Sequence, residues 1–214
     1  MLKVAAALVA GVVAMGGWAV VTVKDLPEYF VAGQQYTIEF QVRQHGRTLL
    51  SGLRPQLVID SPGARAVVIP AVARSAEGTY AVTFTAPAPA PAAGEVRFTI
   101  RSGFMNNELR LYPQPVIAAG TSRPAMAARD RGQVLFVAKG CNTCHSNIDL
   151  ADRPDNQLVT VGPELGGRHL AREYVIQKVK NPASEKMPDL GLTDAEATAI
   201  AALLNGERGA LSGR

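Results

Sequence analysis

Residues 141–145 read Cys141-Asn142-Thr143-Cys144-His145, and this pentapeptide decides how the second half of the chain is organised. The C-x-x-C-H pattern is the attachment sequence for c-type haem. Its two cysteines are spaced to form thioethers to the two vinyl groups of the porphyrin, and the imidazole that follows them is placed to bind the iron. The pattern therefore predicts one covalently attached haem c, with His145 as an axial ligand.

Other uses of a C-x-x-C pair fit this chain less well. A structural zinc site needs four nitrogen or sulfur ligands, and outside the pentapeptide only His45 and His169 remain to supply them. A thioredoxin-like pair needs a βαβ context. A structural disulfide would leave His145 without a role. Haem remains the preferred interpretation.

The positive charge of the chain lies in its first part. Residues 1–128 hold 11 Lys and Arg against 7 Asp and Glu, whereas residues 129–214 hold 11 of each. Neither part contains a basic run of the kind that binds nucleic acid. The sequence also shows no catalytic triad, phosphate-binding loop or paired carboxylates. We expect neither a nucleic-acid partner nor a small-molecule substrate.

The N-terminal region begins with an apolar run over residues 4–23, between Lys3 and Lys24. This run of twenty uncharged residues has about the length that a transmembrane helix needs. It is longer than the apolar region of about 7–15 residues that is usual in a cleaved signal peptide, which is the alternative. We therefore predict a transmembrane anchor over residues 1–24 that contacts the lipid bilayer, with Trp18 at the interface and the N-terminus inside.

Residues 25–117 carry the period-two alternation of apolar and polar side chains that is typical of half-buried strands. The clearest predicted strands are residues 36–42, 79–85 and 95–101, and weaker ones are 56–60, 66–69 and 108–112. Several short strands without a helical period predict an all-β sandwich of immunoglobulin-like type. A cupredoxin-like copper site needs two His and a Cys; this segment has one His and no Cys, so we reject copper.

The same segment weakly resembles the immunoglobulin-like domains, FixH-like or YtkA-like, that occur beside bacterial oxidases and metal-handling proteins. The resemblance is carried by Gln44-His45-Gly46 and by Glu77-Gly78-Thr79-Tyr80. It implies an extracytoplasmic binding or spacing module. Residues 118–128 lack both periods and are predicted to be a linker.

Three helices are predicted in the last part of the chain, residues 129–214. The first starts near Arg129 and ends at Gly140, which suits a C-cap. The second covers residues 169–180 and stops before Asn181-Pro182. The third starts at the capping box Thr193-Asp194-Ala195-Glu196 and closes at Asn205-Gly206.

Residues 129–206 resemble class I cytochromes c, because C-x-x-C-H, Gly162-Pro163-Glu164-Leu165 and Met187-Pro188 follow one another in the order typical of that family. The resemblance implies an all-α haem domain in which Gly132 and Phe136 lie where the first and last helices cross. Its implied site residues are the following: Cys141 and Cys144 for attachment, His145 and Met187 as iron ligands, Pro163 as the carbonyl partner of His145, Leu165 in the same turn, and Arg168 near a haem propionate.

His169 is a second candidate for the sixth ligand of the iron, less favoured than Met187. A soft sulfur opposite an imidazole favours ferrous iron and suits electron transfer. The alternative for Met187 is a role as core filler. The polar loop 146–160 has no predicted role.

Together these features predict a multidomain chain: an N-terminal transmembrane helix, an all-β immunoglobulin-like sandwich and an all-α cytochrome c domain. We expect an electron-transfer protein rather than an enzyme, held in the bacterial cytoplasmic membrane with both domains on the periplasmic side. Its expected donor is a quinol–cytochrome c reductase, and its acceptor a haem–copper oxidase or a photosynthetic reaction centre.

Two alternatives stay open. The protein is either a shuttle of this kind or a permanently docked relay subunit of one large respiratory or photosynthetic complex. A haem peroxidase or gas sensor, in which Met187 leaves the iron, is the less favoured possibility.

Overall fold

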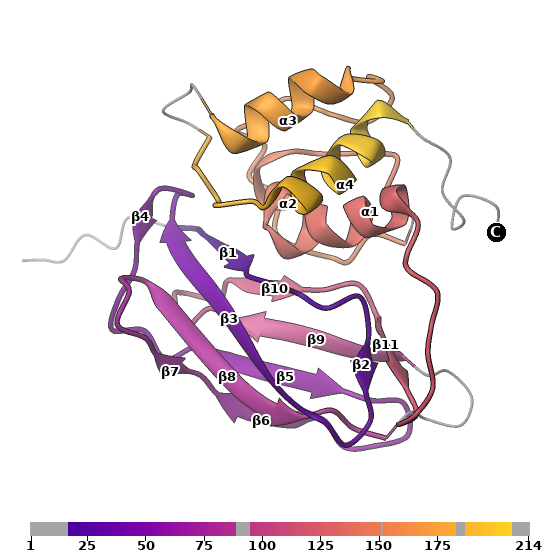
Figure 1. Ribbon diagram of the computed structural model, residues 1–214. Coiled ribbons are helices and arrows are strands. Elements are labelled where there is room, and N and C mark those ends of the chain that lie inside the picture. Colours follow the sequence, from indigo (N-terminus) through magenta and orange to yellow (C-terminus); the bar gives the residue numbers. More distant parts are fainter. Residues whose placement is uncertain (1–16, 89–94, 151, 183–186, 207–214) are drawn as a thin grey trace, which may run out of the picture.

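The computed structural model describes residues 17–88, 95–150, 152–182 and 187–206. These residues form a β-sandwich followed by a helical domain that lies against one side of it (Figure 1). Within the described ranges, no helix combines the length and the apolar character needed to span a bilayer.

The sandwich consists of two sheets whose strands are antiparallel, apart from one parallel pair. The first sheet has the order β1 (Ala19–Val23), β3 (Gln35–Gln44), β8 (Thr79–Thr85) and β7 (Val72–Ala73), with β4 (Thr48–Leu49) also paired to β3. The second has the order β2 (Phe30–Val31), β11 (Gln114–Ile117), β9 (Glu95–Arg101), β5 (Gln56–Asp60) and β6 (Val67–Pro70), with β10 (Glu108–Arg110) also paired to β9. The parallel pair is β2 with β11.

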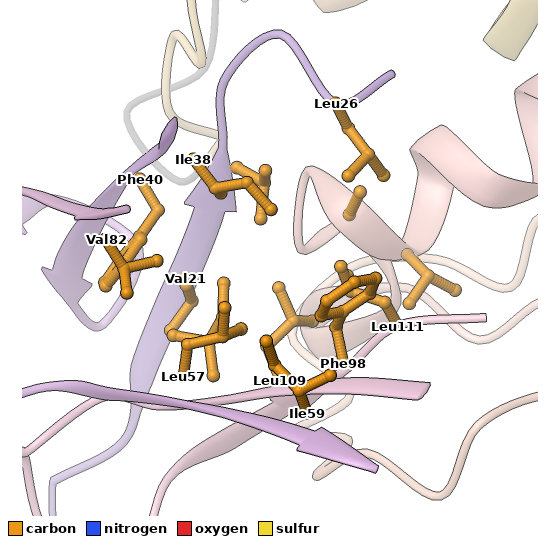
Figure 2. Close-up of a cluster of buried hydrophobic side chains, with 14 of the residues drawn as sticks. Val21, Leu26, Ile38, Phe40, Leu57, Ile59, Val82, Phe98, Leu109 and Leu111 are labelled. Atoms are coloured by element: carbon orange, nitrogen blue, oxygen red, sulfur yellow. The ribbon is translucent and has the colours of Figure 1, made fainter. Parts of the chain in front are cut away.

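Alternating side chains from the facing strands fill the space between the sheets, as the period-two pattern predicts. In β3, for example, Ile38, Phe40 and Val42 are buried while the residues between them are only partly covered. Figure 2 shows this cluster, with Phe40, Leu57 and Phe98 among its members. The three clearest predicted strands are confirmed as β3, β8 and β9.

Strand β1 corrects the prediction of a helix through residues 4–23. All five residues of Ala19–Val23 are buried in an extended conformation, and Val21 pairs with Val42 of β3. A segment that completes a sandwich cannot also cross a bilayer, so the prediction is wrong for these residues. The ring of Trp18, directly before β1, lies 5.4 Å from the ring of His45.

The correction shortens the apolar run that remains. Residues 1–16 lie outside the described residues, so the rest of the predicted anchor is described only by its sequence. The uncharged run before β1 is residues 4–18, about 15 residues. That is less than the roughly 20 that a spanning helix needs and matches the upper length of a signal-peptide apolar region.

The helical domain contains the three predicted helices and a short turn of helix at the C-x-x-C motif. Their bounds are α1 (Ala128–Ala138), α2 (Cys141–Cys144), α3 (Arg172–Lys180) and α4 (Asp194–Asn205). Helix α3 starts later than predicted, because His169 has a positive φ of 45° that a right-handed helix excludes.

The ends of these helices follow the predicted capping chemistry. Gly140 follows the last turn of α1 with a φ of 76°, a conformation that glycine adopts without strain. The capping box of Thr193 and Glu196 starts α4, and Gly206 ends it with a φ of 83°.

Helix α1 crosses α4 at a very small separation. A Cβ atom added to Gly132 would lie 2.0 Å from the carbonyl oxygen of Ala199, so only glycine allows the two backbones to approach this closely. This confirms the predicted place of Gly132. Phe136, one turn further along, is 1 % exposed and belongs to the helical core.

The other side of α1 belongs to the sandwich. Val134, Val137 and Ala138 are part of the same buried cluster as the sandwich side chains. The side chain of Arg131 donates hydrogen bonds to the carbonyl oxygens of Leu26 and Pro27. The helical domain is therefore packed directly on the sandwich, at the side that carries β1 and β10 (Figure 1).

Candidate haem site

One pocket in the helical domain gathers all seven predicted site residues. Its volume is about 350 Å³, within the range of about 300–1,000 Å³ that is usual for ligand sites. The predicted residues that line it are Cys141, Cys144, His145, Pro163, Leu165, Arg168 and Met187. Most of the remaining lining is apolar, including Leu170, Val175, Val179, Leu190 and Leu204.

The imidazole of His145 is held by the turn that follows it in the pocket wall. Its Nδ1 lies 2.9 Å from the carbonyl oxygen of Pro163. A proton on Nδ1 donates this bond and leaves the lone pair on Nε2, the arrangement that a histidine ligand of a metal requires. The turn itself is tied to the motif, because the N–H of Gly162 donates to the carbonyl of Cys144 at 2.9 Å.

Gly162 is needed for this arrangement. A Cβ atom at this position would lie 2.3 Å from Cε1 and 2.5 Å from Nδ1 of His145. Any larger residue would push the imidazole away from the Pro163 carbonyl. Gly162 therefore leaves room for the imidazole of His145, and Pro163 supplies the carbonyl oxygen that accepts its hydrogen bond.

The two cysteines are free thiols that line the same pocket. Their spacing of three residues in the helical turn α2 brings both side chains to one face. Desolvation raises the pKa of the Cys141 thiol to about 12 and also raises that of Cys144. The described residues contain no group of three or more His, Cys, Asp or Glu side chains placed to hold a metal ion. The position of both thiols on one face of the pocket suits covalent attachment of a ligand.

Among the methionines of the described residues, Met187 lines the pocket. It is half-buried and packs against the helical core. By contrast, Met105 is 58 % exposed and Met126 packs against the sandwich core. His169 lies at the end of α4, where its Nδ1 is 3.3 Å from the carbonyl oxygen of Asn205, and it does not line the pocket.

The rim of the pocket carries two cationic side chains. Arg168 was expected there, and its Nη1 donates to the carbonyl of Glu164 at 3.2 Å. Lys178 was not expected; it lies over the ring of Tyr174, with Nζ 5.7 Å from the ring centroid. Both Tyr174 and Lys178 line the pocket from α3, and their i, i+4 spacing could have indicated a shared face. Two cations at an apolar pocket suit a ligand with carboxylate groups.

Glu164 fixes the turn that contains Pro163. Its carboxylate accepts hydrogen bonds from the N–H groups of Gly166 and Ile148 at 2.7 and 3.3 Å. A hydrogen bond from the Ser146 side chain, followed by these N–H groups, holds the pKa of Glu164 below its usual value. The carboxylate of Glu164 therefore connects Ile148, near the start of the segment that follows His145, with Gly166 at the end of that segment.

The loop 146–160, which had no predicted role, connects the motif to the sandwich. The side chain of Asn156 accepts from the N–H of Arg110 at 2.7 Å and donates to its carbonyl at 2.9 Å. The N–H of Val159 donates to the carbonyl of Thr143 at 2.9 Å. The loop thereby links strand β10 to α2.

These observations test whether haem c fits the residues that are present. The pocket provides a pre-oriented imidazole, a thioether, two neutral thiols on one helical face and two rim cations in an otherwise apolar lining. Gly162 clears the space that the imidazole occupies. The donor set matches that of a c-type haem site with His and Met as axial residues.

Replacement of Gly162 by alanine should disturb the histidine side of this site. The added methyl group overlaps the His145 ring, and overpacking of this kind costs about 1–3 kcal/mol. We expect a lower haem content per chain and an altered absorption spectrum in the haem-loaded protein. Leu158→Ala is the control, because Leu158 is partly exposed and does not line the pocket. A Gly162→Ala protein with the wild-type haem content and spectrum would show that the close approach has no role.

Comparison with known families supports this interpretation of the helical domain. Residues 127–204 match the family model described as "Cytochrome C oxidase, cbb3-type, subunit III". No curated protein matches the chain. Among solved structures, E. coli alpha-2-macroglobulin in its native conformation is 16% identical over 52% of this chain and 7% of that chain, with a TM-score of 0.37. A similarity this low carries no argument about fold or function. The family match and the pocket together support a c-type cytochrome domain over residues 127–204, with electron transfer through haem as its chemistry.

Proposed function

We propose that this protein is a monohaem c-type cytochrome that passes single electrons within a membrane redox chain, with a haem–copper oxidase as its acceptor. One observation carries the proposal: His145, held by the carbonyl of Pro163 at 2.9 Å, lines the same pocket as Met187. With haem bound, the imidazole and the thioether would both serve as iron ligands. This donor set would leave no site for a substrate, and it supports electron transfer.

Each residue of the pocket has a definite part in this function. Bound haem c supplies a one-electron iron couple. Cys141 and Cys144 would hold the porphyrin through thioether bonds. The carbonyl of Pro163 would keep Nε2 of His145 as the ligand atom. Arg168 and Lys178 would offset the negative charge of the haem carboxylates.

The choice of partner rests on the family description and on the surface beside the pocket. The matched family is named for a subunit of a cbb3-type cytochrome c oxidase, which supports an oxidase as acceptor. Val161 and Tyr174 line the pocket and are 48 % and 50 % exposed, and Ile148 nearby is 79 % exposed. Such apolar side chains give a redox partner an uncharged contact area. A quinol–cytochrome c reductase is the proposed donor.

The second candidate function is that of a resident relay subunit of one oxidase complex. The family description favours it, because it names a subunit rather than a free carrier. The chemistry at the pocket is the same in both cases. The two candidates differ only in whether the cytochrome leaves its acceptor.

We also propose that the sandwich is immunoglobulin-like. Strands β1, β3, β8 and β7 form one sheet, and β5, β9 and β11 lie together in the other. In chain order this corresponds to the A-B-E-D and C-F-G sheets of immunoglobulin domains. The parallel pairing of β2 with β11 corresponds to a first strand that is shared between the sheets.

The proposed location is the periplasmic side of a bacterial cytoplasmic membrane, where c-type haem is attached in the resembling family. The apolar run over residues 4–18 is proposed to be an export signal rather than an anchor that reaches Val23, because Ala19–Val23 belongs to the sandwich. Association with the membrane would then come from the redox partner.

The N-terminus of the mature protein tests this location. We expect the intact mass of the haem-loaded protein, isolated from cells, to lack Met1 and the residues up to a point before Ala19. N-terminal sequencing of the same sample is the matching check. A membrane-bound, haem-loaded protein that retains Met1 would contradict cleavage and support an anchor.

Carbon monoxide tests the sixth ligand. The reduced wild-type spectrum should be unchanged by carbon monoxide, because the thioether of Met187 occupies the site. Met187→Ala should bind carbon monoxide nearly completely, whereas Met126→Ala should behave as the wild type. Wild-type protein that binds carbon monoxide readily would favour a peroxidase or gas sensor, and an unreactive Met187→Ala would assign the ligand to another residue.

The mobility of the haem on a native gel distinguishes a carrier from a resident subunit. Unfractionated cell lysate in mild detergent is separated and stained for haem, so that a carrier without an anchor stays in the sample. As a carrier, the protein should run near the mass of the single chain, at most 22.6 kDa plus haem. Co-migration with a haem–copper oxidase would establish the resident subunit. Co-migration with a complex that lacks such an oxidase would contradict both candidates.

A further inference from the structure

The haem pocket contains a side chain that does not come from the cytochrome domain. Val20 of β1 lines the pocket and is 2 % exposed. It belongs to the sandwich, more than 100 residues before the motif in the chain. A sandwich that served only as a spacer would not need to contribute a side chain to the haem pocket.

Strand β1 lies directly against the start of the haem-attachment motif. A Cβ atom at Gly140 would be 2.5 Å from Cγ1 of Val20 and 2.7 Å from the carbonyl oxygen of Val21. The hydroxyl of Thr22 donates to the carbonyl of Lys139 at 3.3 Å. The residue before Cys141 is therefore in van der Waals contact with the sandwich.

The turn between β3 and β4 reaches the other end of the site. A Cβ atom at Gly46 would lie 3.5 Å from Cγ2 of Val20 and 3.8 Å from Cγ of Pro188, the residue after Met187. An added Cβ would thus be in ordinary contact with both. The turn therefore lies beside the pocket wall and beside the segment that carries the proposed sixth ligand.

We infer that the sandwich is a working part of the haem site: Val20 closes one wall of the pocket, and the β3–β4 turn beside Pro188 helps to hold Met187 on the iron. The inference rests on the proposed function, because it treats Met187 as a ligand. It replaces the expectation that the sandwich is a spacer.

This arrangement has two physical consequences. A ligand loop that packs against a rigid sheet spends less time away from the iron, so external ligands compete poorly for the sixth position. An apolar side chain in the wall also keeps water from the haem and favours the less charged ferrous centre. Loss of the contact should therefore raise carbon monoxide binding and lower the reduction potential.

The test compares Val20→Ala with Val82→Ala in the full-length, haem-loaded protein. Val82 is a valine of β8, 1 % exposed in the same sandwich core, but it does not line the pocket. Both changes remove the same methyl groups from buried sites, so both should lower the melting temperature. Only Val20→Ala should also lower the potential and raise the carbon monoxide-reactive fraction of the ferrous protein by about three- to tenfold.

Val20→Thr provides a second variant in case Val20→Ala loads little haem. It keeps the branched shape of the side chain and puts a hydroxyl group in the pocket wall, and Val82→Thr, at a buried position that does not line the pocket, is its control. Val20→Thr should lower the potential, and Val82→Thr should leave it unchanged. The inference is overturned when Val20→Thr, and Val20→Ala where it loads haem, keep the wild-type potential and carbon monoxide response.

The wild-type measurement separates this inference from the proposed function. Wild-type protein that already binds carbon monoxide readily shows that the thioether does not hold the iron, and the proposed function then fails before any variant is compared. Wild-type protein that resists carbon monoxide leaves the variants to decide the role of the sandwich.

Discussion

Helix α1 belongs to two hydrophobic cores at once, and the position of the haem motif depends on it. Val134 and Val137 pack into the sandwich core, whereas Leu135 and Phe136 pack into the helical core. Such burial on both sides leaves the helix almost no freedom to shift. Because Cys141 follows closely after the end of α1, the fixed position of this helix also fixes the position of the haem-attachment motif.

A buried ion pair adds to the same constraint. Lys139, at the end of α1, is 2 % exposed, and its Nζ lies 2.6 Å from Oε1 of Glu196. The other carboxylate oxygen of Glu196 accepts the N–H of Thr193 and completes the cap of α4. Breaking a pair of this kind on one side typically costs about 3–5 kcal/mol, since it leaves an uncompensated buried charge. Glu196 thus links the start of α4 to Lys139, which lies two positions before Cys141.

The sequence predicts the chemistry of the site better than the relation between the two parts of the chain. Cys141, His145 and Met187 are found from short patterns, and the strands around Phe40 are found from alternation. For Ala19–Val23 the sequence predicts the end of a transmembrane helix, whereas the structure has a strand with all five side chains buried. In the sequence, a fully buried strand is a continuous run of apolar residues. The spacing of apolar residues cannot distinguish such a run from part of a buried helix. The position of Val20 in the pocket wall depends on how the sandwich packs against the helical domain. No short sequence pattern predicts that packing.

X-ray absorption at the iron edge of the purified protein tests the central claim most directly, because it reports the atoms bound to the metal. One iron per chain, with a single sulfur and five nitrogens as its nearest neighbours in both oxidation states, is the predicted result. The nitrogens are those of the porphyrin and His145, and the sulfur is that of Met187. A first shell without sulfur, or more than one iron per chain, would contradict a monohaem site closed by histidine and methionine.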